Sequence, residues 1–143
     1  MKNTMRKGFL LMAMLAVVLA VGLAFVSCDT MGGGGSALDG DWSSNGNSGL
    51  YIRINGSTGT FTSIPSSGNW RNAANRGDIR VGSPKFRNLR RTGNYEWTGE
   101  SIAVSSSTAS WHSTTITLAS NGRTFSLYTP GATGAPTDTY TRR

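Results

Sequence analysis

Two glutamates are the side chains in this sequence that come nearest to a catalytic pair. Glu96 and Glu100 lie on either side of Gly99 and close to aromatic residues. If the chain turns at Gly99, their carboxyl groups can approach to within the roughly 5–10 Å that glycoside hydrolysis uses. The competing interpretation, which we favour, is that both carboxylates are exposed and keep the surface soluble.

Other catalytic and metal-binding patterns are missing from the sequence. His112 is the single histidine, and the apolar residues predicted on its strand face favour a partly buried structural side chain over a general base. There is no G-x-S-x-G elbow, no H-E-x-x-H motif and no Cys/His metal spacing. We therefore expect no enzyme activity, no cofactor and no metal. An envelope glycoside hydrolase that uses Glu96 and Glu100 is kept as an alternative.

The start of the chain has the pattern of an export signal. Three basic residues precede an apolar run from residue 8 to residue 26, and the run ends at Ser27-Cys28. The run is long enough to be a transmembrane helix. However, no lysine or arginine follows it before Arg53, so we favour a cleaved signal.

Ser27-Cys28, with Phe25 where leucine is common, resembles the lipobox of bacterial lipoproteins. The resemblance implies that residues 1–27 are a signal peptide, that Cys28 is lipidated, and that residues 28–38 are a Gly-rich tether. Two or three acyl chains anchor a protein durably, because each buried methylene contributes about 0.8 kcal/mol. We expect a mature protein outside the cytoplasm, held by this lipid in the bacterial cell envelope, at the outer membrane.

Composition limits the partners of the mature chain. Removing the first 27 of 143 residues leaves 116, with 11 basic and seven acidic residues and a net charge of +4. This modest excess suggests attraction to anionic envelope surfaces. We expect no nucleic-acid partner, because an exported protein does not meet nucleic acid.

Residues 39–143 are predicted to form one all-β domain. Short apolar–polar alternations are separated by turn signals such as Asn55-Gly56 and Asn121-Gly122, as in antiparallel sandwiches and barrels. Residues 86–91 are out of strand phase, which suggests a bulge or a helical turn; Ile79 and Val81 mark a short strand. The predicted core comprises Leu50, Ile52, Ile54, Ile102, Val104, Ile116, Leu118, Phe125 and Leu127, with Phe61, Tyr95, Trp97 and Trp111.

The two ends of the domain resemble those of lipocalin-like, or calycin, barrels. Gly40-Asp41-Trp42 is similar to the G-x-W of their first strand. The resemblance implies a small antiparallel up-and-down barrel of about eight strands, in which Trp42 plugs one end and Arg142 or Arg143 of the last strand stacks on it. The helix that usually lies beside such a barrel has no candidate here. A β-sandwich is the alternative fold.

Aromatic residues are the stronger indication of a binding function. Trp70 and Arg71 lie in a predicted polar loop, residues 65–75, which suits a surface for a ligand or for an envelope or host partner. If the barrel is hollow, the family resemblance implies a carrier of a small apolar ligand, with Tyr140 and Arg142 as polar anchors. We expect a filled barrel, a non-enzymatic interaction module, and a cleft near Trp70 smaller than about 300 Å³.

Overall fold

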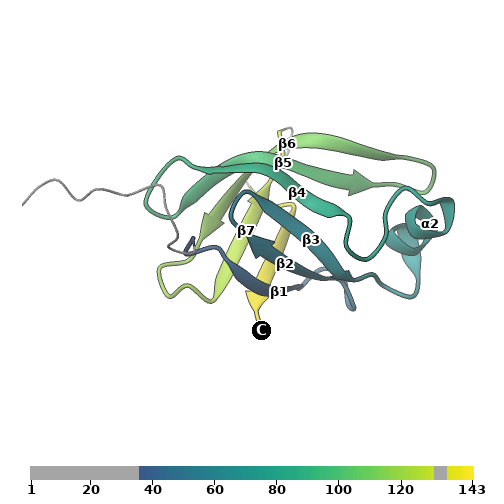
Figure 1. Cartoon of the computed structure of the whole chain (residues 1–143), viewed down its shortest axis with the longest axis horizontal. Helices are drawn as coiled ribbons and strands as arrows, with labels where there is room; N and C mark the ends of the chain where they lie inside the picture. Colours follow the sequence, from purple (N-terminus) through teal and green to yellow (C-terminus); the bar gives the residue numbers. More distant parts are fainter. Residues whose placement is uncertain (1–35, 131–134) are drawn as a thin grey trace, which may run out of the picture. The chain divides into compact units, whose positions relative to one another are not determined.

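The computed structural model describes residues 36–130 and 135–143. They form a closed antiparallel barrel, compatible with a lipocalin-like barrel, in which each strand pairs with the next in sequence and the last pairs with the first (Figure 1). The all-β up-and-down fold predicted from the sequence is confirmed, and the sandwich is not formed. The strands are β1 (Gly40–Ser44), β2 (Tyr51–Asn55), β3 (Thr58–Ser63), β4 (Pro84–Arg91), β5 (Glu96–Val104), β6 (Ala109–Leu118), β7 (Thr124–Tyr128) and β8 (Asp138–Arg142).

Both Asn-Gly pairs lie at hairpins, although the turns differ from the predicted form. Asn55 still pairs with Thr58, so the two loop residues are Gly56 and Ser57. Gly56 has φ 59°, as expected for the first loop position of a type II′ turn. The β6–β7 hairpin has a longer loop, in which Gly122 takes the left-handed conformation at φ 69°.

A β-bulge in β4 sets which side chains face outward. The register between β4 and β5 shifts by one residue between Arg87 and Arg90, so that Arg87 pairs with Glu100 and Arg90 with Thr98. Asn88, inside the bulge, has φ 55°, a conformation that asparagine tolerates better than most residues. The bulge predicted for residues 86–91 is therefore present, and it turns both arginines to the outer wall.

Gly99 lies within β5 opposite this bulge, so the turn predicted at Gly99 is wrong. A Cβ atom at this position would lie 2.8 Å from the Arg87 carbonyl oxygen and 2.9 Å from the Leu89 side chain. The bulge brings backbone close to β5, and only glycine leaves room for it.

We expect Gly99→Ala to lower the free energy of unfolding by about 1–3 kcal/mol, because the new methyl group displaces the bulge. Urea unfolding of the variant measures the loss. Gly93→Ala is the matched control, since its Cβ would meet the nearest atom at an ordinary 3.4 Å. Equal effects at the two positions would show that close packing does not explain the glycine in β5.

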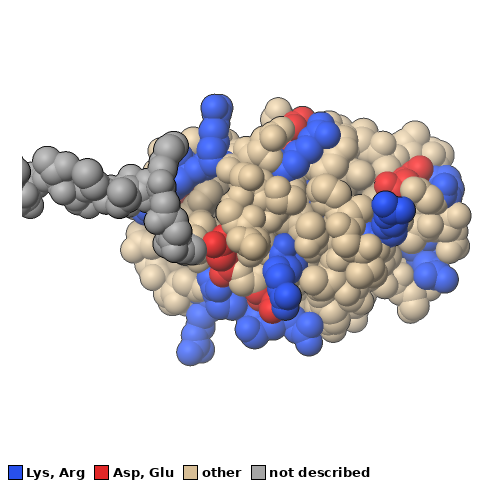
Figure 2. Space-filling view, viewed as in Figure 1, with Lys and Arg blue, Asp and Glu red and all other residues tan. Residues whose placement is uncertain are grey.

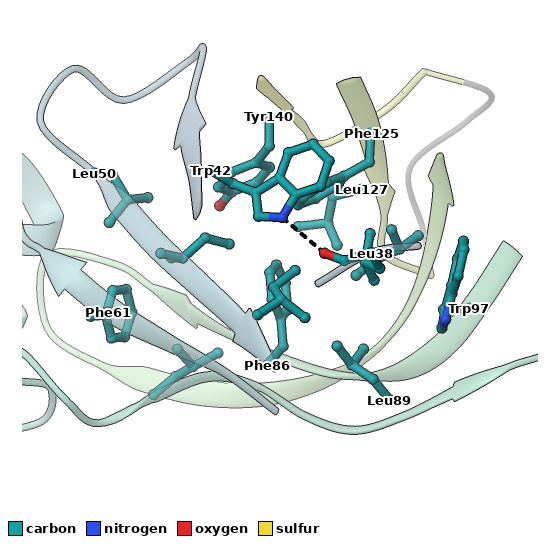
Figure 3. Packing of buried hydrophobic residues seen from close by; sticks show 14 of the residues in the cluster. Leu38, Trp42, Leu50, Phe61, Phe86, Leu89, Trp97, Phe125, Leu127 and Tyr140 are labelled. Carbon is teal, nitrogen blue, oxygen red and sulfur yellow. Dashed lines mark hydrogen bonds between the residues drawn. The ribbon is translucent and has the colours of Figure 1, made fainter. Parts of the chain in front are cut away.

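Aromatic rings fill the interior of the barrel (Figure 3). Neighbouring rings in this cluster lie 4.7 to 6.2 Å apart between centroids. The interior of an eight-stranded barrel is just wide enough for its own side chains to fill, which agrees with this dense packing. The five largest fully buried side chains are Trp42, Phe61, Phe86, Phe125 and Tyr140.

The predicted core is buried apart from three residues. Val104 and Trp111 are half-buried, and Tyr95 is 49 % exposed because it lies before β5 in the β4–β5 connection. The strand predicted around Ile79 and Val81 is not formed; Ile79 is buried in the connection before β4, and Val81 is 61 % exposed in a turn.

Helix α2 (Gly68–Arg76) stands where the sequence predicted a polar loop and no helix. It lies beyond the strand ends at one end of the barrel, which we call the open end (Figure 1). Ala73 is fully buried, and Gly77 ends the helix with φ 83°. The prediction failed because so short and polar a helix is stabilised by packing on the barrel and not by its own propensity.

Candidate functional site

At the opposite end, which we call the closed end, Trp42 joins the first strand to the last. Trp42 pairs with Arg142 across β1 and β8, and the guanidinium carbon lies 4.3 Å from the indole centroid. The indole is fully buried, and its Nε1 donates a hydrogen bond of 3.0 Å to the Leu38 carbonyl oxygen (Figure 3). The contact within about 6 Å that a cation–π pair requires is therefore made by Arg142.

The structure explains why the first residue of the G-x-W sequence, Gly40, is a glycine. Gly40 has φ 138°, and a Cβ there would lie 2.5 Å from Nη1 of Arg142. The guanidinium also donates hydrogen bonds to three carbonyl oxygens, of Asp39 at 2.6 Å, Ala37 at 2.7 Å and Gly122 at 2.9 Å. Three of the five N–H donors of Arg142 thus bond to backbone carbonyls of the fold, and these contacts give it a structural role.

Arg143 and the start of the domain complete the closed end. The Arg143 guanidinium lies 4.2 Å from the Tyr51 centroid, so it stacks on the outer wall and not on the barrel plug. Leu38, which the sequence assigned to the tether, is fully buried. The packed domain therefore begins by Leu38, slightly earlier than residue 39.

At the open end, Trp70 of α2 packs onto the barrel. Its ring meets Phe61 edge-on at 5.7 Å, and its Nε1 donates to the Asn47 Oδ1 at 3.1 Å. A cleft of about 380 Å³ lies beside it. A cleft does lie at the predicted place, but it is larger than predicted because the helix stands out from the strand ends. The expectation that any pocket would lie near Trp70 is wrong, since a larger groove lies on the outer wall. Arg71 is exposed on the same helix.

Lys85 is buried behind Trp70 at the open end. It is 3 % exposed, and its Nζ lies 4.9 Å from the Trp70 centroid and 5.2 Å from that of Phe86. The ammonium donates to the Ile102 carbonyl oxygen at 2.6 Å, and within the described ranges no carboxylate pairs with it. Burial lowers the pKa of Lys85 to about 7, although the negative charge of Asp138 acts to raise it. No pattern in the sequence singled out Lys85 as a buried residue.

Tyr140, which the family resemblance implied as a polar anchor inside a hollow barrel, is a core residue and not part of an accessible surface. It is fully buried, and its ring stacks on Phe125 at 4.7 Å. Inward alternation along β8 places it among the interior rings. Its hydroxyl has no hydrogen-bond partner among the described residues. Burial, followed by the charge of Asp138, raises the pKa of the phenol.

A second hollow, larger than the cleft beside Trp70, lies on the outer wall of the barrel. A groove of about 670 Å³ runs across β4 to β7, which is within the size range of ligand sites. Alternate residues of these strands are buried, for example Trp97 in β5 and Ile116 in β6. The residues next to them along each strand therefore face outward. The outward side chains of the groove include Arg90, Thr98, Glu100, Ser113, Thr115 and Tyr128.

The two glutamates lie on one strand and have different partners, Glu96 a hydroxyl of Thr92 and Glu100 the side chains of Arg87 and Asn88. Both lie in β5, four residues apart, which separates their Cα atoms by about 13 Å at the rise of a strand. Glu100 accepts two hydrogen bonds from Arg87 and one from Asn88, and these bonds hold the pKa of its carboxyl below the usual value. Glu100 is therefore an ion-paired groove residue, and Glu96 is exposed.

His112 is exposed, contrary to the partly buried position predicted for it. Its Nε2 shares a hydrogen bond of 2.8 Å with the Ser110 hydroxyl on the same strand. The inward alternation of β6 does bury Thr114, Ile116 and Leu118, but His112 is nearer the open end of the barrel, where the same face is reached by solvent.

The remaining sequence predictions concern metals and the membrane. Across residues 36–130 and 135–143, no three acidic, histidine or cysteine side chains are grouped as metal ligands would be. The same residues contain no helix with the length and apolarity to span a membrane. The signal peptide of residues 1–27 and the lipidation of Cys28 lie outside the described residues.

Comparison of the chain with protein-family models, with curated proteins and with solved structures finds no match.

Proposed function

We propose that this protein is a lipid-anchored protein of the bacterial cell envelope whose barrel is a non-enzymatic binding module. The binding role is supported by the contrast between the interior of the barrel and its outer wall. The interior is occupied by buried aromatic rings, whereas a groove of about 670 Å³ lies on the outer wall. A filled barrel leaves its outer surface as the place for a partner.

The anchor rests on the N-terminal sequence. The basic start, the apolar run and Ser27-Cys28 form the recognition pattern, and Cys28 is the single cysteine of the chain. The folded domain begins by Leu38. The intervening segment, with four consecutive glycines at 32–35, suits a spacer between lipid and domain. Envelope exposure and a groove outside the barrel favour a partner within the envelope or on a surface that it touches.

We expect Cys28→Ser to abolish membrane anchoring when the full chain is expressed in a bacterium. The serine cannot receive a thioether-linked diacylglycerol, so the protein should appear in the soluble fraction or remain as uncleaved precursor. Fractionation followed by intact-mass measurement distinguishes these products and detects the lipid on the wild type.

Ser36→Ala is the control, because it changes a residue beyond the signal and leaves Cys28 in place. It should fractionate as the wild type does. A Cys28→Ser protein that is trimmed to the wild-type N-terminus and stays with the membrane would rule out the lipid anchor.

A further inference from the structure

The outer groove is built from side chains that lie side by side across four strands. Arg90 pairs with Thr98, Thr98 with Thr115, and Thr115 with Tyr128. All four residues line the groove. Adjacent strands are about 4.8 Å apart, so these residues form one continuous row of outward polar side chains.

A second row lies beside the first. Arg87 pairs with Glu100, and Glu100 with Ser113. The bulge of β4 is what brings Arg90 outward in line with the first row, because it adds one residue between the two arginines. The groove therefore presents hydroxyls, a guanidinium and a carboxylate at the regular spacing of the sheet, on a wall whose inner side is fixed by the packed core.

The charges of the groove are mostly neutralised within it. Glu100 is bonded to Arg87 at 2.8 Å and to Asn88 at 2.9 Å, so it offers acceptor oxygens without an unpaired charge. Arg90 contacts Thr98 only weakly, at 3.4 Å, and has no carboxylate partner in the described part of the chain. One unpaired cation is too few for a polyanion, which is recognised by several.

The distribution of charge over the wider surface also argues against a polyanionic partner. On the face seen in Figure 2, lysine and arginine side chains are scattered, with acidic side chains beside some of them and uncharged surface between. A protein partner fits poorly as well, because protein interfaces have an apolar core. In the two rows of the groove, Tyr128 is the single large ring.

We propose that the groove binds a neutral glycan chain through hydrogen bonds to the sugar hydroxyls. A sugar presents donors and acceptors on neighbouring ring carbons, and the threonine and serine hydroxyls of the two rows can act as either. Glu100 adds acceptors, Arg90 adds donors, and Tyr128 supplies a ring against which a sugar face can pack. This inference rests on the proposed binding role and names its class of partner.

The test uses the full-length protein purified in detergent, with two insoluble neutral glycans as probes: cellulose and chitin. Co-sedimentation over a range of protein concentrations gives an apparent Kd. We expect retention by at least one glycan, with less than a twofold change when NaCl is raised from about 0.05 to 0.5 M, since a neutral ligand releases few counterions.

The double variant Thr98→Val and Thr115→Val removes two hydroxyls with little change in side-chain shape. It should bind about four- to a hundredfold more weakly, because each of the two lost hydrogen bonds weakens binding by about two- to tenfold. Thr60→Val, at an outer position of β3 away from the groove, is the matched control and should bind as the wild type does. Valine suits a strand, so all variants should keep the wild-type circular dichroism spectrum.

Two results would overturn the glycan assignment. One is absence of retention by either glycan. The other is retention that the double variant and the control share, or that disappears in high salt. The Cys28→Ser test is independent, so a failed glycan assignment leaves the anchor intact. A photo-cross-linker at residue 115 that captures envelope protein without glycan retention would keep the binding module and reject the glycan.

Discussion

Replacing Trp42 with alanine is expected to lower the free energy of unfolding by about 3–5 kcal/mol, as for other buried aromatic residues. The indole is fully buried, packs edge-on against Phe125 at 4.7 Å and lies under the Arg142 guanidinium. Its removal leaves a cavity at the point where β1 meets β8, and Leu38 loses a hydrogen-bond donor to its carbonyl oxygen. Urea unfolding followed by tryptophan fluorescence and circular dichroism measures the loss.

Two further variants make this result specific to closure. Arg142→Lys keeps the charge but cannot reach three carbonyl oxygens at once, so it should lose about 1–3 kcal/mol. Tyr95→Ala removes a ring that is 49 % exposed and should change stability by less than about 0.5 kcal/mol. If Trp42→Ala is no more destabilising than Tyr95→Ala, Trp42 does not hold the barrel closed. If it fails to fold, Arg142→Lys decides the same question.

The features that the sequence predicted are those specified by local patterns. Alternation of apolar and polar residues identified most of the core, because every interior position of a barrel repeats with the same period of two. The resemblance of Gly40-Asp41-Trp42 to the first strand of lipocalin-like barrels implied that Arg142 or Arg143 stacks on the indole. The structure shows that Arg142 does so, and that Gly40 leaves room for its guanidinium.

The features that were missed depend on contacts between distant segments. Helix α2 has little apolar character of its own, and it is positioned by Trp70 against Phe61 and Asn47 from other parts of the chain. Gly99 suggested a turn by residue type, whereas its real role depends on a bulge in the neighbouring strand.

The outer groove was missed because its residues are ordinary strand-surface side chains. Thr98, Thr115 and Tyr128 become a row only when β5, β6 and β7 are placed in register. The one sequence signal that could have located it was the phase change in residues 86–91, because the bulge there determines where Arg90 points.

Lys85 is the least predictable residue of the fold, and its replacement should have the opposite effect to that of Trp42. Lys85→Met is expected to raise the free energy of unfolding by about 2–4 kcal/mol at pH 6, because methionine fills the same space without a buried charge. Arg71→Met removes an exposed cation from α2 and is the matched control, with a change below about 0.5 kcal/mol. Loss of stability in Lys85→Met would mean that the ammonium and its bond to the Ile102 carbonyl oxygen stabilise the barrel end.

The pH dependence of stability gives the same residue a second and sharper signature. The pKa of Lys85 is about 7 in the folded protein and 10.5 in the reference state, so between these values the unfolded chain binds a proton that the folded chain does not. Stability must then rise with pH, by about 1.4 kcal/mol per unit above pH 7 and by about 3 kcal/mol between pH 7 and 9.5. Below pH 7 both states are protonated and the contribution is constant. The raised pKa of the Tyr140 phenol acts in the opposite direction, but only above about pH 10, where the unfolded phenol begins to ionise.

Urea unfolding at intervals from pH 6 to 9.5 should therefore give a rising curve for the wild type and for Arg71→Met, and a nearly flat one for Lys85→Met. Parallel curves for the wild type and Lys85→Met would show that the lysine keeps its charge inside the barrel, and that the Asp138 charge offsets its burial.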